Sequence, residues 1–252
     1  MAARTDDFMF SKPRALCYNM DSPLRKEPIP RMKAIIWDMD GTLTDTETYW
    51  TQNIFRLLEH YGVPDPRGRE APWFGTATSE TIKNYLASPD CRLSLSYHEC
   101  RVWCRNYIYT HTYAQGAPLK PGALETLRAA KALGVPMCLL SASEHQALKY
   151  TLYRLDMGKY FDFWESTCFK KQDKTAPALF RRCAARMGVE TQDCLLVEDA
   201  LYSMQTGKSV GMTVWGIEDA KQIKQKQQIL ATADRYFTNH YDLAQALREE
   251  TK

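Results

Sequence analysis

The sequence lacks a hydrophobic run of the roughly 18–20 residues that a membrane span needs. It also has little that is typical of a secretory signal: residues 1–31 carry six basic side chains but no central apolar segment, so we expect that they are not such a signal. Four prolines in this stretch disfavour a long helix, and its four acidic residues argue against an organelle transit peptide. We therefore expect no membrane partner and interpret residues 1–31 as an N-terminal extension, with Met32 as a candidate start of translation.

The sequence also lacks a large excess of charge of one sign. The net charge is only +3 over 252 residues, and no block of like charges marks an interaction tail. Because binding to nucleic acid depends mainly on concentrated basic charge, we expect no nucleic-acid partner. The content of 44% apolar and 25% charged residues is that of a globular protein.

The eight cysteines form no C-x-x-C pair and no Cys/His cluster with the spacing of a zinc finger. Cys138 and Cys194 lie inside apolar runs, which is typical of small core residues. Disulfides persist mainly in oxidising compartments. We therefore expect reduced thiols in a cytoplasmic protein, and we expect a monomer.

What the sequence does contain is an alternation of short apolar runs with helical patterns. Such an alternation predicts a parallel sheet with helices on both faces, a Rossmann-like three-layer α/β core. Runs of strand length lie at Lys33–Trp37, 136–140, 194–197, 212–215 and 235–237. Helical patterns lie between and after them, at about 122–133, 144–154, 176–187, 201–210 and 220–231.

The interval between the first two runs breaks this alternation. It shows helical periodicity and no convincing strand, and prolines and glycines interrupt it as loops. We therefore predict an α-helical cap over residues 46–117, inserted into a core made of residues 32–45 and 118–252. Hinges are expected near Thr46 and 116–118.

Acidic side chains follow two of the predicted strands. Asp38 and Asp40 follow the first, and Glu198 and Asp199 follow the run at 194–197. In an open parallel sheet such positions meet at the carboxyl edge, where ligands bind. Because clustered carboxylates repel one another, and because Mg²⁺ prefers oxygen ligands, the pattern predicts a magnesium site.

A hydroxyl and a lysine complete the expected site. Ser141 follows the second run, and Lys174 precedes a helical pattern. Carboxylates, Mg²⁺, a hydroxyl and a lysine around one point suit phosphoryl transfer, in which charge neutralisation and alignment dominate catalysis. The spacing of Asp38 and Asp40 directs both side chains the same way, so one carboxylate could attack phosphorus while the other transfers protons. Gly41 would let the chain turn tightly beside the phosphate.

The segment DMDGTLTD, residues 38–45, resembles the first motif of the haloacid dehalogenase-like superfamily, DxDGT(L/V)xD. Three later signatures follow in the family's order: the serine motif Leu139–Ser141, the motif lysine at Lys174 and the acidic motif 196–199. Further segments, YFD at 160–162, EDA at 198–200 and KSVGM at 208–212, resemble the subgroup of β-phosphoglucomutases and phosphatases with an inserted helical cap. The resemblance extends over residues 32–237.

This resemblance implies specific roles. Asp38 would be the nucleophile and a Mg²⁺ ligand, and Asp40 the acid/base with its backbone carbonyl on Mg²⁺. Asp199 would be a further ligand, and Glu198 a ligand or its neighbour. Dehalogenases of the superfamily usually carry Tyr in place of the second Asp, so Asp40 indicates phosphate esters. The implied phosphate site consists of Gly41, Thr42, Ser141, Ala142 and Lys174.

The sequence departs from that of the mutases at two positions, and both departures favour a phosphatase. The segment TDTETY at 44–49 is similar to the mutase sequence, but Trp50 follows where the mutases have His. Thr78 occupies the position of the mutases' cap Arg. We therefore predict a phosphatase for a small phosphorylated metabolite such as a sugar phosphate. The alternatives are a β-phosphoglucomutase-like mutase and a non-catalytic phosphate-binding protein.

Several positions are candidates for substrate contacts and remain open. The segment WFGTAT at 73–78 lies where the family has its cap specificity loop, and Arg101 and Arg105 share one helix face that either is solvated or contacts an anionic substrate. The segment from Lys174 reads KTAPA rather than the usual KPxPD, so Lys170 and Lys171 are alternatives for the motif lysine. The cap and pocket candidates are Trp50, Gly75, Thr76, Thr78 and His145. For His145, which follows the serine motif, a position on the surface of a helix is the favoured alternative.

Overall fold

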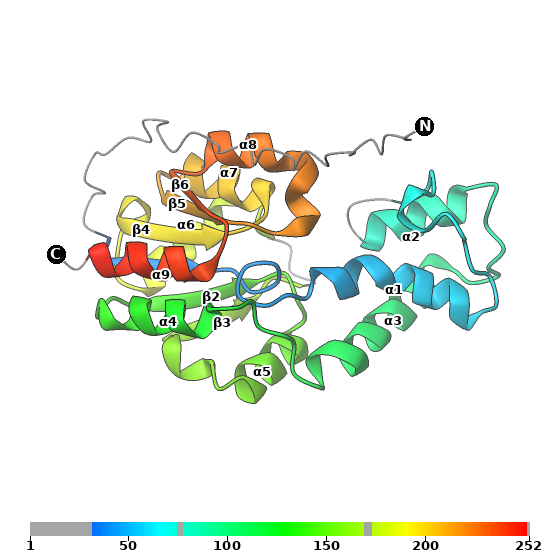
Figure 1. Cartoon of the computed structure of the whole chain (residues 1–252), viewed down its shortest axis with the longest axis horizontal. Coiled ribbons are helices and arrows are strands. Elements are labelled where there is room, and N and C mark those ends of the chain that lie inside the picture. The colour runs from blue at the N-terminus through cyan, green and yellow to red at the C-terminus, as the bar shows by residue number, and fades with distance from the viewer. Residues whose placement is uncertain (1–31, 75–77, 169–172, 251–252) are drawn as a thin grey trace, which may run out of the picture.

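The computed structural model describes residues 32–74, 78–168 and 173–250. The extension 1–31, the cap-loop candidates Gly75 and Thr76, and the alternative lysines Lys170 and Lys171 lie outside the described residues. The core is a six-stranded parallel sheet of order β3-β2-β1-β4-β5-β6 (Figure 1). Its strands are β1 Ala34–Trp37, β2 Met137–Ser141, β3 Phe163–Ser166, β4 Cys194–Glu198, β5 Thr213–Ile217 and β6 Arg235–Phe237.

Alternate side chains of the central strand enter two separate apolar cores. Ile35 and Trp37 pack with α4 Ala123–Ala132, α5 His145–Arg154 and α9 His240–Glu249. Ala34 and Ile36 face the other way, toward α6 Pro177–Arg186, α7 Leu201–Ser209 and α8 Lys226–Thr232. Because helices cover both faces, the central strands are apolar at nearly every position, and the predicted three-layer α/β core is confirmed.

Two core elements were not predicted, and one helical pattern is divided. Strand β3 was missed because its sequence, FWES, is short and ends in polar residues. Helix α9 was missed too, although Asn239 caps it by accepting a hydrogen bond from the Asp242 N–H. The predicted helix at 220–231 consists of a 3₁₀ segment, η5 Ala220–Gln225, followed by α8.

Between β1 and β2 the chain forms a helical layer with an apolar core of its own. Helices α1 Glu47–His60, α2 Thr78–Ala87 and α3 Tyr97–Ile108 pack around buried residues such as Leu57 and Trp73. Figure 1 shows these helices standing beside the sheet as a distinct lobe. The predicted insertion of a helical cap is therefore confirmed, while its limits at residues 46 and 117 stay a prediction. Shorter elements are the 3₁₀ segments Gly68–Glu70, Gly158–Tyr160 and Thr191–Asp193 and the π-helical turn η2 Tyr109–Tyr113.

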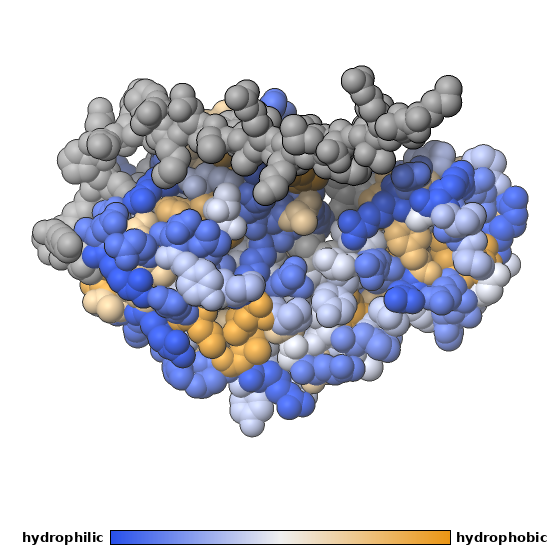
Figure 2. Space-filling model, in the orientation of Figure 1, coloured by the Kyte–Doolittle hydropathy of each residue, from blue (hydrophilic) through white to orange (hydrophobic). Residues whose placement is uncertain are grey.

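The described part of the chain contains no helix that is long and apolar enough to cross a membrane. Hydrophilic residues dominate the face shown in Figure 2, and apolar residues gather there only in small groups. The apolar side chains are mainly used inside the three cores described above.

Candidate active site

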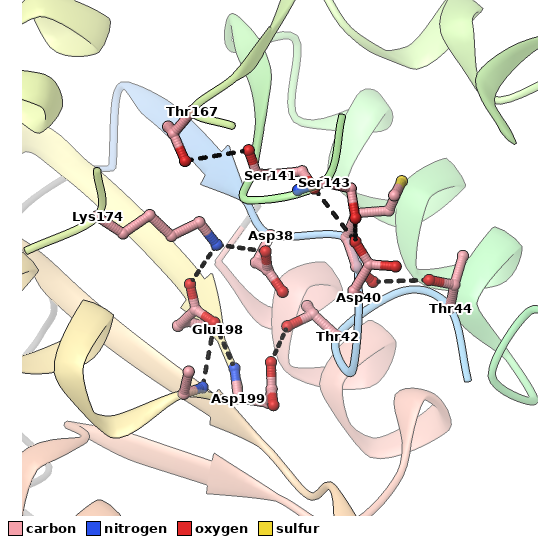
Figure 3. A network of polar contacts seen from close by, with 12 residues as sticks. Asp38, Asp40, Thr42, Thr44, Ser141, Ser143, Thr167, Lys174, Glu198 and Asp199 are labelled. Carbon is pink, nitrogen blue, oxygen red and sulfur yellow. Dashed lines mark hydrogen bonds and ion pairs between the residues drawn. The ribbon is translucent and has the colours of Figure 1, made fainter. Parts of the chain in front are cut away.

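Strands β1, β2 and β4 end at the same level of the sheet, because Trp37 of β1 is paired with Leu139 on one side and Val197 on the other. Asp38 follows β1 directly, and Ser141 and Glu198 are the last residues of their strands. The carboxyl edge therefore gathers the predicted residues, as Figure 3 shows. A cavity of about 290 Å³ opens here, lined by both core and cap residues.

Lys174 lies between two carboxylates at the floor of this site (Figure 3). Its Nζ donates to Oδ1 of Asp38 and, at 2.8 Å, to Oε2 of Glu198. All three side chains are buried. Burial acts to lower the pKa of Lys174, but the charges of Asp38 and Glu198 outweigh it and raise the pKa well above its usual range. Lys174 is therefore a fixed positive charge beside Asp38.

One lysine does not neutralise the acidic groups around it. Burial raises the pKa of Asp38 to about 7, with the charge of Glu198 adding to the effect and Lys174 opposing it. Oxygen atoms of Asp38, Glu198 and Asp199 lie within 4.8 Å of one another, and all three side chains are buried. A compact, buried set of oxygen donors with surplus negative charge suits a hard divalent cation such as Mg²⁺. The residues thus fit the predicted metal, and the Asp40 side chain does not belong to this cluster.

The turn after β1 holds Asp199 in place. Gly41 has φ of +86°, and a Cβ atom there would lie 2.6 Å from Oδ2 of Asp199, so no other residue fits without displacement. The Thr42 hydroxyl donates to Oδ1 of Asp199 at 3.1 Å, and Gln222 Nε2 donates to Oδ2 at 3.2 Å. The Thr42 hydroxyl is fully buried and engaged by Asp199, so a contact of Thr42 with phosphate, which stays a prediction, would not use this hydroxyl as it lies here.

Asp40 accepts hydrogen bonds from four hydroxyl groups. Oδ1 accepts from Thr46 at 2.6 Å and from Tyr113 at 2.7 Å. Oδ2 accepts from Ser143 at 2.6 Å and from Ser141 at 3.2 Å. These donors come from the start of the cap, from the turn that leaves the cap, and from the end of β2. The position of this carboxylate is therefore defined jointly by core and cap.

Trp50 connects this network to helix α1 of the cap. Its Nε1 donates to the Tyr113 hydroxyl at 2.8 Å, and its carbonyl accepts from Thr78 at 3.2 Å. Burial raises the pKa of Tyr113 well above its usual value, and the charge of Asp40 adds to this. Tyr113 is therefore a neutral phenol that donates to Asp40.

The remaining predicted residues divide into two groups. Trp50, Thr78 and Ala142 line the cavity, and so do Arg101 and Arg105. His145 does not: it is exposed, packs on Trp164 with ring centroids 4.7 Å apart, and lines a separate surface depression. The cavity at Asp38 therefore does not include His145. His145 begins helix α5, and the depression that it lines also contains Ser166 at the end of β3.

Sequence reasoning missed several residues of this site. Tyr113 and Ser143 contact Asp40, Gln222 contacts Asp199, and Asn53 lines the cavity from the cap. Ser143 carried the only local signal, since it follows Ser141 by two residues at a strand end. The others approach from distant parts of the chain, which no spacing reveals.

A sheet edge with three buried carboxylates and a lysine, beside an inserted helical cap, is the arrangement that phosphoryl transfer calls for. The family model of the haloacid dehalogenase-like hydrolases matches residues 32–211, and the chain belongs to that family. The chain is thus an enzyme, a hydrolase, and the resemblance found in its motifs is confirmed.

Curated relatives and solved structures agree with this assignment. The chain is 25% identical to a phosphorylated carbohydrates phosphatase of Thermotoga maritima, over 74% of this chain and 85% of the relative. It is 28% identical to 6-phosphogluconate phosphatase of Escherichia coli strain K12, over 73% and 82%. The crystal structure of a β-phosphoglucomutase from Clostridium difficile superposes with a TM-score of 0.64 at 21% identity, covering 87% of this chain and 97% of that one. The latter likeness establishes the fold.

Proposed function

We propose that this protein is a Mg²⁺-dependent phosphatase that hydrolyses a small phosphate monoester through a phosphoryl intermediate on Asp38. The observation that carries the proposal is the environment of Asp38, whose carboxylate is buried against Lys174 and belongs to a cluster of three carboxylates. A carboxylate so placed faces a phosphoryl group whose charge the lysine and a cation would offset.

Asp38, Glu198 and Asp199 would hold the cation. When bound, Mg²⁺ would supply positive charge to the phosphoryl oxygens and to the carboxylates. The lysine that also contacts Glu198 keeps Asp38 oriented within this cluster.

In the first step, an oxygen of Asp38 attacks phosphorus while the bond between phosphorus and the leaving oxygen breaks. Asp40 donates a proton to that oxygen, and the product alcohol departs. In the second step, water attacks the phosphoryl group, Asp40 takes its proton, and the P–O bond to Asp38 breaks to give inorganic phosphate. Lys174 and the Ser141 region would neutralise and orient the phosphoryl oxygens.

The relatives support a phosphorylated carbohydrate as the substrate, because two of them are named for phosphatase activity on such compounds. A sugar-phosphate mutase would use the same nucleophile and remains the alternative. The two differ in outcome: a phosphatase releases inorganic phosphate at every turnover, whereas a mutase returns it to the sugar.

The test is a phosphate-release screen over sugar, sugar-acid and polyol phosphates, with Mg²⁺ and with EDTA. We expect Mg²⁺-dependent release that Asp38→Asn abolishes while the fold is retained. The control is Asp90→Asn, which changes a half-buried carboxylate that pairs with Arg67 on the cap, outside the cavity. Release by Asp38→Asn at the wild-type rate would refute the nucleophile, and slow release with rapid isomerisation would favour the mutase.

A further inference from the structure

The cavity above Asp38 has a second polar end, formed by the cap. Asn53 of α1 and Arg101, Cys104 and Arg105 of α3 line the same cavity as the catalytic carboxylates. The proposed phosphatase chemistry uses none of these four residues. Because one continuous cavity joins the two ends, a substrate whose phosphoryl group lies at Asp38 would direct its other end toward the cap.

Asn53 is the clearest sign of an absent partner at this end. The side chain is only 1% exposed, and neither its amide nitrogen nor its amide oxygen has a hydrogen-bond partner among the described residues. Buried amides are nearly always hydrogen-bonded, because desolvating them without compensation is costly. An amide that lines a cavity and has no hydrogen-bond partner in the protein is suited to bind a polar group of a ligand that enters the cavity.

Arg101 brings positive charge to the same wall. Its guanidinium is half-buried, lies 6.0 Å from the centre of the Tyr97 ring and donates to the Tyr97 hydroxyl at 3.4 Å. Within the described chain it forms no ion pair with a carboxylate. Tyr97 thus positions the Arg101 side chain, and the positive charge of Arg101 remains available to bind an anion.

Arg105, one turn further along α3, is engaged only loosely. Its Nε lies 3.4 Å from Oε1 of Glu144, which belongs to the core. This contact is longer than a close charge-assisted hydrogen bond, so an incoming anion would compete with Glu144 for the guanidinium. Two arginines and an amide therefore face one end of the cavity.

We propose that Asn53, Arg101 and Arg105 form a subsite for an anionic group at the far end of the substrate, a carboxylate or a second phosphate. The inference rests on the proposed function and narrows it to phosphate monoesters that carry another negative charge. Guanidinium groups present paired donors that match carboxylate and phosphate oxygens, and the amide suits an adjacent hydroxyl or the anion itself. A neutral sugar would use the amide but would leave Arg101 without an ion pair and Arg105 in its loose contact with Glu144.

The experiment compares matched substrates that differ only at the far end. Glycerate 3-phosphate and gluconate 6-phosphate carry a carboxylate where glycerol 3-phosphate and glucitol 6-phosphate carry a hydroxymethyl group. Fructose 1,6-bisphosphate against fructose 6-phosphate tests a second phosphate. We expect kcat/KM to favour the charged member of at least one pair by about 10- to 100-fold, as for a charged hydrogen bond. The pair that shows this preference identifies the anion.

Arg101→Gln should reduce this preference at least tenfold, by lowering kcat/KM for the charged member far more than for its neutral partner. The matched control is Arg56→Gln, which removes an exposed cap arginine that pairs with Glu59 outside this cavity. A charged-to-neutral ratio that Arg101→Gln leaves unchanged would overturn the proposal, as would wild-type enzyme with no preference in any pair.

Asn53→Leu tests whether the unsatisfied amide of Asn53 contacts the substrate or has no role in binding. Removing an unsatisfied buried amide should keep or raise the melting temperature, while a ligand role predicts at least a fivefold loss in kcat/KM for the preferred substrate. A stabilised protein with unaltered kcat/KM would exclude Asn53 from the subsite.

Binding measurements keep this inference separate from the proposed function. Calorimetric titration of each compound into Asp38→Asn, with and without Arg101→Gln, requires no turnover. Tighter binding of the charged members that depends on Arg101 supports the subsite even if the wild-type chain releases no phosphate, in which case only the proposed function fails. Equal binding of charged and neutral members refutes the subsite even in an active phosphatase.

Discussion

The phenol of Tyr113 donates a hydrogen bond of 2.7 Å to Oδ1 of Asp40. Tyr113 ends the π-helical turn η2, through which the chain leaves the cap, and Asp40 lies at the catalytic edge of the core. Trp50 of the cap in turn donates to the same phenol. A movement of the cap would therefore reach the proposed proton-transfer residue through this phenol as well as through the Thr46 hydroxyl.

Tyr113→Phe removes only this hydroxyl. We expect kcat to fall about tenfold, the cost of about 1.4 kcal/mol for one hydrogen bond to a charged group. The loss should be smaller with 4-nitrophenyl phosphate, because that leaving group needs little protonation. The control is Tyr153→Phe, at a tyrosine that is 81% exposed. An equal loss with both kinds of substrate would show that Tyr113 acts on the fold in general and not on Asp40.

Lys174→Met removes the buried ammonium group that offsets the negative charge of the three-carboxylate cluster. We expect the metal-free protein to lose about 3–5 kcal/mol of stability, as for a buried ion pair broken on one side. Phosphate release should fall at least 100-fold, as when a charge-stabilising group is removed from an active site. Thermal unfolding with and without MgCl₂ and phosphate-release assays measure the two effects. Lys149→Met, at an exposed lysine of α5, should change neither, and a stable, active Lys174→Met would contradict the assignment.

Gly41→Ala tests the contact between the first turn and Asp199. The added Cβ would lie 2.6 Å from Oδ2 of that carboxylate, at a φ of +86° that alanine also disfavours. We expect the Mg²⁺ concentration for half-maximal activity to rise about 10- to 100-fold, as when a group that orients a metal ligand is disturbed. Gly62→Ala is the matched control, because Gly62 has φ of +69° but nothing within 4 Å of a Cβ atom. Similar Mg²⁺ requirements in the two variants would mean that strain alone, and not Asp199, is affected.

The sequence predicted those parts of the site that lie next to one another along the chain. The apolar strand before Asp38 and the spacing of Asp38 and Asp40 are local features. Ser141 and Glu198 of the later motifs lie at the ends of strands that the hydrophobic periodicity also predicts. Lys174 was correctly placed beside Asp38, although the motif around it departs from the family pattern. These positions depend on backbone geometry within a few residues, which sequence patterns record.

Other features depend on packing between distant segments. Tyr113 reaches Asp40 across 73 residues, and the carbonyl of the buried Asn53 contacts Cys104 of helix α3, whose face could not be oriented from periodicity alone. The contact of the Thr42 hydroxyl with Asp199, which lies 157 residues away, likewise gives no signal in the sequence. The sequence left the position of His145 open for the same reason, since the direction of α5 decides which depression its first residue lines.

His240 couples the stability of the core to pH. The side chain is 1% exposed, its Nε2 donates to the Thr42 carbonyl at 2.8 Å, and its Nδ1 lies 3.1 Å from Oγ1 of Thr126. Burial lowers the pKa of His240 from 6.5 to about 4. The folded protein therefore keeps this imidazole neutral in a pH range where the unfolded chain takes up a proton.

Because the unfolded state binds more protons between about pH 6.5 and 4, the contribution of His240 to stability is complete above pH 6.5 and decreases as the pH falls. At pH 5 we expect a loss of about 2 kcal/mol relative to pH 7 from this residue alone. Urea unfolding at both pH values, compared with His240→Gln, isolates this contribution, because other groups titrate equally in the two proteins. The control is His98→Gln, at an exposed histidine of the cap, which should keep the pH dependence of the wild type. If His240→Gln instead lost as much stability as the wild type between pH 7 and pH 5, the imidazole would have to be protonated inside the folded core, and both nitrogen contacts would need a different explanation.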